Sequence, residues 1–139
     1  MRGGIHHIDL TVREPQASFA LYDAFLRFLG YELVNRDDAA IEWTLEGGKG
    51  SPSISLVKAK GSGSGKQHDR YSPGLHHLAW EADSREDVDR LHALLVEINA
   101  DVLDAPADYP QYNKGKGYYA VFFADADRLK LEYAFTPPS

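Results

Sequence analysis

The 139-residue sequence contains no cysteine. Disulfide bridges, thiolate metal ligands and a cysteine nucleophile are therefore excluded. No apolar run approaches the length of a membrane span, and the first residues contain no apolar signal segment. We therefore expect a cytoplasmic protein that has no membrane partner.

Basic residues are also few, because 15 Lys and Arg stand against 21 Asp and Glu, for a net charge of −6. The basic residues form no stripe along the chain, so nucleic acid is not an expected partner. Hydrophobic residues make up 43% of the sequence, which is enough for a packed core. This length suits one domain, or two very small halves that share a core.

The most informative feature is an internal repeat. The segment GIHHIDLTV at residues 4–12 returns as GLHHLAWEA at residues 74–82. At the same offset of 70 residues, Leu21 aligns with Leu91 and Phe25 with Leu95. No gap is needed from residue 4 to residue 33, which indicates two copies of one structural unit.

Each copy predicts the same order of elements. An apolar strand at 5–12 or 75–82 is followed by a helix with apolar residues at three- and four-residue spacing. The further expected strands are 31–36, 41–46 and 53–58 in the first copy, and 101–104, 117–124 and 129–135 in the second. Three glycines, Gly47, Gly48 and Gly50, mark a turn.

The predicted fold class is α+β, built from two tandem βαβββ modules. Module one covers about 4–58, module two covers about 74–135, and a flexible connector at about 59–73 contains GSGSG. The loop 105–116 is long for a small domain, and loops of that length are often functional or mobile.

Alternation along the strands predicts one polar face in each module. His7, Asp9 and Thr11 share a face of the first strand, and His77 and Glu81 share the matching face of its copy. The neighbouring His6 and His76 are expected on the helix-facing side, either as packing residues or as residues that support a ligand. Glu132 lies on the polar face of the last strand.

His7, His77 and Glu132 therefore converge if their three strands join in one sheet or cleft. Two imidazoles and one carboxylate with open coordination positions suit Fe(II), and with small changes Mn, Ni, Co or Zn. A metal-free cleft is the alternative interpretation of the same three residues.

Three motifs carry a family resemblance: HIDLTV at 7–12, HLAWEA at 77–82 and FADADRLKLEY at 123–133. With the paired βαβββ layout they resemble the vicinal oxygen chelate superfamily, over essentially the whole chain. That superfamily includes glyoxalases, bleomycin-resistance proteins, extradiol dioxygenases, fosfomycin-resistance enzymes and methylmalonyl-CoA epimerases. The resemblance implies one cupped mixed sheet around a central cleft, in which His7, His77 and Glu132 hold one divalent ion. It also implies a homodimer.

The sequence departs from the family pattern in three places. Ser55 stands where glyoxalase I-like members often have a second Glu, which favours three ligands over four. The usual Pro and Gly of the last turn are Ala126 and Arg128, so the turn must be made in another way. Fosfomycin chemistry is disfavoured, because Ala120 and Phe122 replace the hydroxyl residues of those enzymes and Asp9 would repel a phosphonate.

Two carboxylates, Asp9 and Glu81, are the candidate catalytic residues. Either one could orient a histidine or act as a general base, although an exposed charge at the edge of the cleft is an equal alternative. The candidate substrate-binding residues are Thr11, Ser55, Tyr112, Tyr118 and Phe122. Of these, Tyr118 and Phe122 would give an aromatic wall on the Glu132 face, unless a one-residue shift of register places them in the core.

The predicted function is a metal-dependent isomerase, lyase or dioxygenase that acts on a small oxygen-bearing organic molecule. The ion would act as a Lewis acid toward two substrate oxygens. The alternative is a metal-free cleft protein that sequesters a small, flat, cationic aromatic compound, as bleomycin-resistance proteins do. A third interpretation is a protein that keeps the site without its activity.

Overall fold

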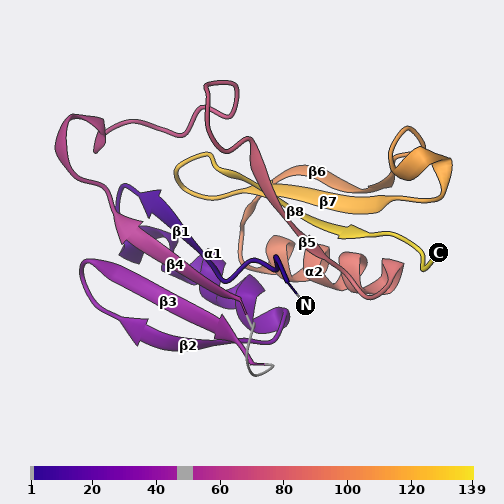
Figure 1. Ribbon diagram of the computed structural model, residues 1–139, viewed down its shortest axis with the longest axis horizontal. Coiled ribbons are helices and arrows are strands. Elements are labelled where there is room, and N and C mark those ends of the chain that lie inside the picture. Colours follow the sequence, from indigo (N-terminus) through magenta and orange to yellow (C-terminus); the bar gives the residue numbers. More distant parts are fainter. Residues whose placement is uncertain (1, 47–51) are drawn as a thin grey trace. The chain divides into compact units, whose positions relative to one another are not determined.

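The computed structural model describes residues 2–46 and 52–139, so the predicted turn glycines Gly47, Gly48 and Gly50 lie outside the described residues. The chain divides into two compact units, 1–67 and 68–139, which we call module one and module two. This division falls inside the expected connector. Among the described residues, each module contains a four-stranded sheet, one α-helix and one short 3₁₀ helix, η1 (Gly61–Gly63) or η2 (Asn113–Gly115) (Figure 1).

Module one contains the elements β1 (His7–Val12), α1 (Pro15–Phe28), β2 (Tyr31–Arg36), β3 (Ala40–Leu45) and β4 (Ser53–Lys58). The strand order is β1-β4-β3-β2, and β1 runs parallel to β4 while the other pairs are antiparallel. Pro15 occupies the first turn of α1, where its missing N–H costs nothing.

Module two contains the elements β5 (His77–Glu81), α2 (Arg85–Glu97), β6 (Asp101–Asp108), β7 (Tyr119–Ala124) and β8 (Lys130–Phe135). Its strand order, β5-β8-β7-β6, repeats that of module one. Ser84 caps α2 by accepting a hydrogen bond of 3.1 Å from the backbone N–H of Asp87. Within the described residues, no helix is both long and apolar enough to cross a membrane.

The prediction of an α+β fold with two βαβββ modules is confirmed. The equivalence of the two modules extends to individual residues. Asp9 and Ala79 are equivalent at the offset of 70 residues. Asp9 pairs with Ser55 in one sheet, and Ala79 pairs with Glu132 in the other. Ser55 therefore occupies the position of Glu132, as the alignment of the two copies predicts. The two sheets are described separately, so a single cupped sheet around a central cleft stays a prediction.

Each helix covers one face of its own sheet with the predicted apolar residues. The fully buried side chains of module one include Tyr22, Phe25, Leu26, Ile41, Trp43 and Leu56. Those of module two include Val88, Leu91, Leu95, Phe123 and Leu131. The opposite face of each sheet is thereby left for polar and site residues.

The predicted boundary between the strand 101–104 and the loop 105–116 is wrong. Strand β6 continues to Asp108, so the connection to β7 covers only 109–118. Pro106 falls between Asp104 and Ala107, where the register of β6 against β7 shifts. A proline is tolerated there because β6 is an edge strand and the shift removes the need for an N–H donor.

The turn before β8 is made without the expected Pro and Gly. The backbone N–H groups of Asp127 and Leu129 both donate to Asp125 Oδ1, at 2.8 and 3.0 Å. Arg128 adopts a φ of +70°, the left-handed conformation for which glycine is the usual choice. The spacing to Glu132 is therefore preserved by side-chain hydrogen bonds.

Candidate functional site

The site is centred on a histidine and a carboxylate from adjacent parallel strands. His77 begins β5, and Glu132 lies on β8 two residues beyond Lys130, the register partner of His77. Their side chains therefore project from the same face of the sheet. His77 Nε2 lies 3.0 Å from Glu132 Oε1, close enough for a charge-assisted hydrogen bond.

Glu132 is an unusually buried carboxylate, with only 3% of its side chain exposed. Burying an ionised carboxylate requires partners for both oxygens. His77 bonds to Oε1, and the Tyr118 hydroxyl donates to Oε2. Burial, together with this hydrogen bond, raises the pKa of Tyr118 above its ordinary value, so its hydroxyl stays a proton donor.

His76 lies beside His77 and not under the helix, so the predicted helix-facing position of His6 and His76 is wrong. The Nδ1 atoms of His76 and His77 are 2.7 Å apart, and those of His6 and His7 are 2.9 Å apart. Both His6 and His76 are exposed and precede the first residue of their strand, where strict alternation no longer applies. In each pair, one Nδ1–H must donate to the other Nδ1.

A pocket of about 340 Å³ opens onto this centre. We call it the His77 pocket, and its lining residues are His76, His77, Tyr112, Tyr118, Phe122, Lys130 and Glu132. Phe122 is the register partner of Glu132 on β7, so the predicted aromatic wall on the Glu132 face is present. Sequence reasoning also placed Tyr112 among the substrate-binding residues, and it lies in this lining.

Two lining residues, His76 and Lys130, were not predicted as site residues. Lys130 Nζ lies 4.4 Å from the centre of the Phe122 ring. Period-two alternation with Glu132 could have identified Lys130, and the occurrence of the His-His pair in both copies could have identified His76.

The predicted site residues of module one also share one face. His7 Nε2 lies 3.9 Å from Asp9 Oδ2, and both side chains are about half exposed. Thr11 follows on the same face of β1, and Ser55 is the register partner of Asp9 on β4. This face therefore offers an imidazole, a carboxylate and hydroxyl groups within module one.

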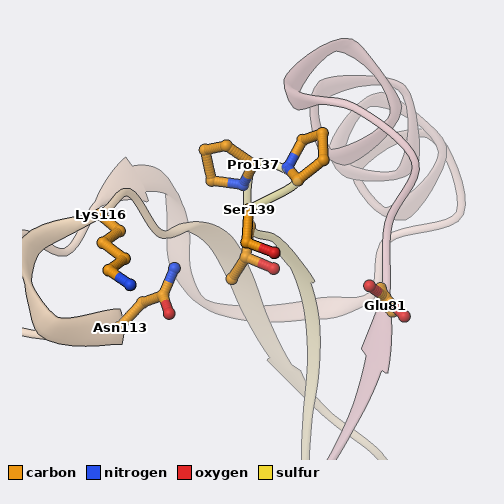
Figure 2. Close-up of a pocket in the computed structure, with 7 residues that line it drawn as sticks. Glu81, Asn113, Lys116, Pro137 and Ser139 are labelled. Carbon is orange, nitrogen blue, oxygen red and sulfur yellow. The ribbon is translucent and has the colours of Figure 1, made fainter.

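Glu81 lies apart from the His77 pocket, at the far end of β5. It lines a second pocket of module two, of about 410 Å³, which we call the tail pocket. Its other lining residues are Asn113, Lys116, Thr136, Pro137, Pro138 and Ser139. Figure 2 shows Lys116 and Asn113 on one side of the 136–139 segment and Glu81 on the other.

The donor set of the His77 pocket fits a divalent ion. An imidazole nitrogen and a carboxylate oxygen are ligands that Fe, Mn, Ni, Co and Zn accept. Tyr118 fixes the second carboxylate oxygen, as outer partners of metal ligands commonly do. Among the described residues, no group of three His, Asp or Glu side chains is arranged to hold a metal ion, and the pair of His77 and Glu132 supplies two donor groups.

Comparisons with known proteins find relatives that cover most of the chain. The chain is 34% identical to the uncharacterized protein YqjT of Bacillus subtilis over 128 residues, covering 92% of this chain and 95% of that protein. A candidate glyoxalase from Bacillus halodurans superposes with a TM-score of 0.78 at 30% identity, with 96% of each chain covered.

A more distant neighbour shares the fold alone. The lactoylglutathione lyase of Agrobacterium tumefaciens superposes with a TM-score of 0.64 at 18% identity, covering 96% of this chain and 93% of that one. The family model of the Glyoxalase/Bleomycin resistance protein/Dioxygenase superfamily matches residues 4–133. The repeated βαβββ topology and this match together establish that the chain belongs to that superfamily.

Proposed function

We propose that the protein is a divalent-metal-dependent enzyme that acts on a small oxygen-bearing organic substrate, as an isomerase, lyase or dioxygenase. His7, His77 and Glu132 are the proposed ligands of one ion of Fe, Mn, Ni, Co or Zn. The observation that carries this proposal is the buried carboxylate of Glu132, which meets His77 Nε2 in a pocket open to small molecules. His77 and Tyr118 hold this buried carboxylate at the wall of the pocket, where its oxygen and the imidazole nitrogen are donors that suit a divalent ion.

The ion, when bound, would supply Lewis acidity to two oxygens of the substrate. The chain's own residues have separate tasks. Tyr118 donates to Glu132 Oε2 and so fixes the plane of the carboxylate. Tyr112 and Phe122 provide apolar surface for the substrate, and Thr11 and Ser55 are proposed to bind its polar groups.

Asp9 and Glu81 are proposed as the carboxylates that move a proton. Asp9 lies near His7, whereas Glu81 lines the tail pocket. Asp9 is therefore the better placed of the two to act beside a proposed ligand. General-base work requires hydrogen-bond reach to the proton that is abstracted.

The first test is the metal content of the purified protein. We expect near-stoichiometric metal in untagged wild-type protein prepared without chelators, and its loss in His7→Ala and His77→Ala. His92→Ala, which removes a histidine of α2, is the matched control and should retain the metal. Inductively coupled plasma mass spectrometry gives both the amount and the identity. No metal in the wild type after reconstitution with each of the five ions would overturn the proposal.

A metal-free binding protein is the second candidate function. The aromatic lining of the His77 pocket favours it, because Tyr112, Tyr118 and Phe122 together suit a flat compound. Such a protein would bind its ligand tightly without turnover. The metal measurement separates the two functions, since this candidate predicts no dependence on any ion.

We also propose a cytoplasmic homodimer in which His7 of one chain joins His77 and Glu132 of its partner. This arrangement predicts complementation between two inactive variants. Equimolar co-refolding of His7→Ala with His77→Ala should restore metal to about a quarter of the sites, because half of the dimers are mixed and each mixed dimer has one intact site. Each variant refolded alone is the control. A mixture that binds no more metal than the separate variants would show that each site belongs to one chain.

A further inference from the structure

Lys130 brings a positive charge into the His77 pocket. It pairs in register with His77, and its Nζ lies against the Phe122 ring. Lys130 is only partly exposed. Among the described residues, no carboxylate forms an ion pair with it. An ammonium group that lies against an aromatic ring and forms no ion pair among the described residues remains available to an anion.

Among the described residues, the lining of the pocket contains one carboxylate, although the protein as a whole is acidic. This carboxylate is Glu132, and both of its oxygens already have hydrogen-bond partners. A ligand with a positive group would therefore meet Lys130 and find no free carboxylate.

The other wall of the pocket is aromatic and planar. Tyr112 is 46% exposed, and its ring stacks on Tyr109 with a centroid distance of 5.6 Å and an angle of 14°. Tyr118 meets the Tyr112 ring edge-on at 5.3 Å. These contacts hold Tyr112 in place, so that it presents fixed apolar surface to a flat molecule.

We propose that the His77 pocket selects a planar, unsaturated or aromatic carboxylate, with its anionic group at Lys130 and its plane against Tyr112. This inference rests on the proposed function, because it takes the His77 pocket as the substrate site and names the class of substrate. It differs from the cationic compound of the alternative sequence-based interpretation, because Glu132, the carboxylate among the described lining residues, already has hydrogen bonds to both oxygens.

The test is the binding of three matched probes to the metal-free full-length protein. The probes are 1-naphthoate, 1-naphthylmethanol and 1-naphthylmethylammonium, which share one ring system and differ in charge. We expect 1-naphthoate to bind most tightly in an NMR titration. Lys130→Met should weaken it about 10- to 100-fold, the range for loss of a charged hydrogen bond, and Lys130→Arg should recover part of the affinity.

Lys116→Met is the matched control, because Lys116 belongs to the same module but lines the tail pocket (Figure 2). It should leave 1-naphthoate binding unchanged. The inference is overturned if Lys130→Met binds 1-naphthoate as the wild type does, or if the ammonium probe binds more tightly than the carboxylate. Circular dichroism confirms that each variant is folded.

The metal content of the same samples distinguishes this inference from the proposed function. If the wild type binds metal and Lys130→Met binds 1-naphthoate as tightly as the wild type, only the proposed substrate class is overturned. A wild type that binds no metal but holds 1-naphthoate through Lys130 overturns the metal-dependent enzyme and supports the anion-selective pocket.

Discussion

Replacing Glu132 with glutamine is expected to weaken binding of the divalent ion by more than about 100-fold, the upper end of the cost of losing an outer partner of a metal site. The substitution keeps the shape of the side chain and removes its charge. The amide oxygen can still accept a hydrogen bond from Tyr118 or His77, so the metal-free fold should persist. Metal titration monitored by calorimetry measures the change.

Tyr118→Phe provides the graded comparison for this prediction. It removes only the hydroxyl that donates to Glu132 Oε2, so we expect a loss of metal affinity of about 10- to 100-fold. Metal affinity is therefore expected to be highest in the wild type, lower in Tyr118→Phe and lowest in Glu132→Gln. If Glu132→Gln bound metal as tightly as the wild type while remaining folded, Glu132 would not be a ligand.

Trp43→Ala is expected to lower the free energy of unfolding by about 3–5 kcal/mol. Trp43 is completely buried on β3, where it contacts Phe19 and Tyr22 of α1 at centroid distances of 6.0 and 6.3 Å. Truncation removes the largest side chain between helix and sheet and leaves a cavity that the surrounding rings cannot fill. Urea denaturation followed by far-ultraviolet circular dichroism gives the free energy of unfolding.

Trp43→Phe separates packing from hydrogen bonding at this position. The indole N–H donates to Asp23 Oδ1 at 2.9 Å, and the same oxygen accepts a 2.8 Å hydrogen bond from Arg27. The carboxylate therefore keeps a partner when the indole is lost, and we expect a cost on the order of 1–2 kcal/mol. Equal destabilisation by phenylalanine and alanine would show that the hydrogen bond, and not the packing, stabilises module one.

The repeated topology was predictable from the sequence because its signals are local. Alternation identified the strands, three- and four-residue spacing identified the helices, and the offset between the copies predicted that both modules share one strand order. Alternation and a turn like that of the resembled family placed Tyr118 and Phe122 on the Glu132 face, and the register of Phe122 and the hydrogen bond of Tyr118 agree.

The predictions that failed concern residues at the ends of strands. The prediction for His6 and His76 assumed that alternation continues before the first strand residue, whereas both lie beside the next histidine. The predicted strand 101–104 is too short, because β6 continues through Pro106, which an edge position and a shifted register tolerate. Hydrogen bonding between strands decides both points, and a single strand's sequence does not encode it.

The sequence by itself determined the two βαβββ modules, the polar face of each sheet and the equivalence of Ser55 with Glu132. Only the tertiary structure decided that His77 and Tyr118 satisfy both oxygens of Glu132, and that Lys130 rather than Glu81 enters the His77 pocket. The physical reason is the range of the interactions. Side-chain direction follows from the residue's place in its own strand, whereas the composition of a pocket depends on the register and bending of neighbouring strands.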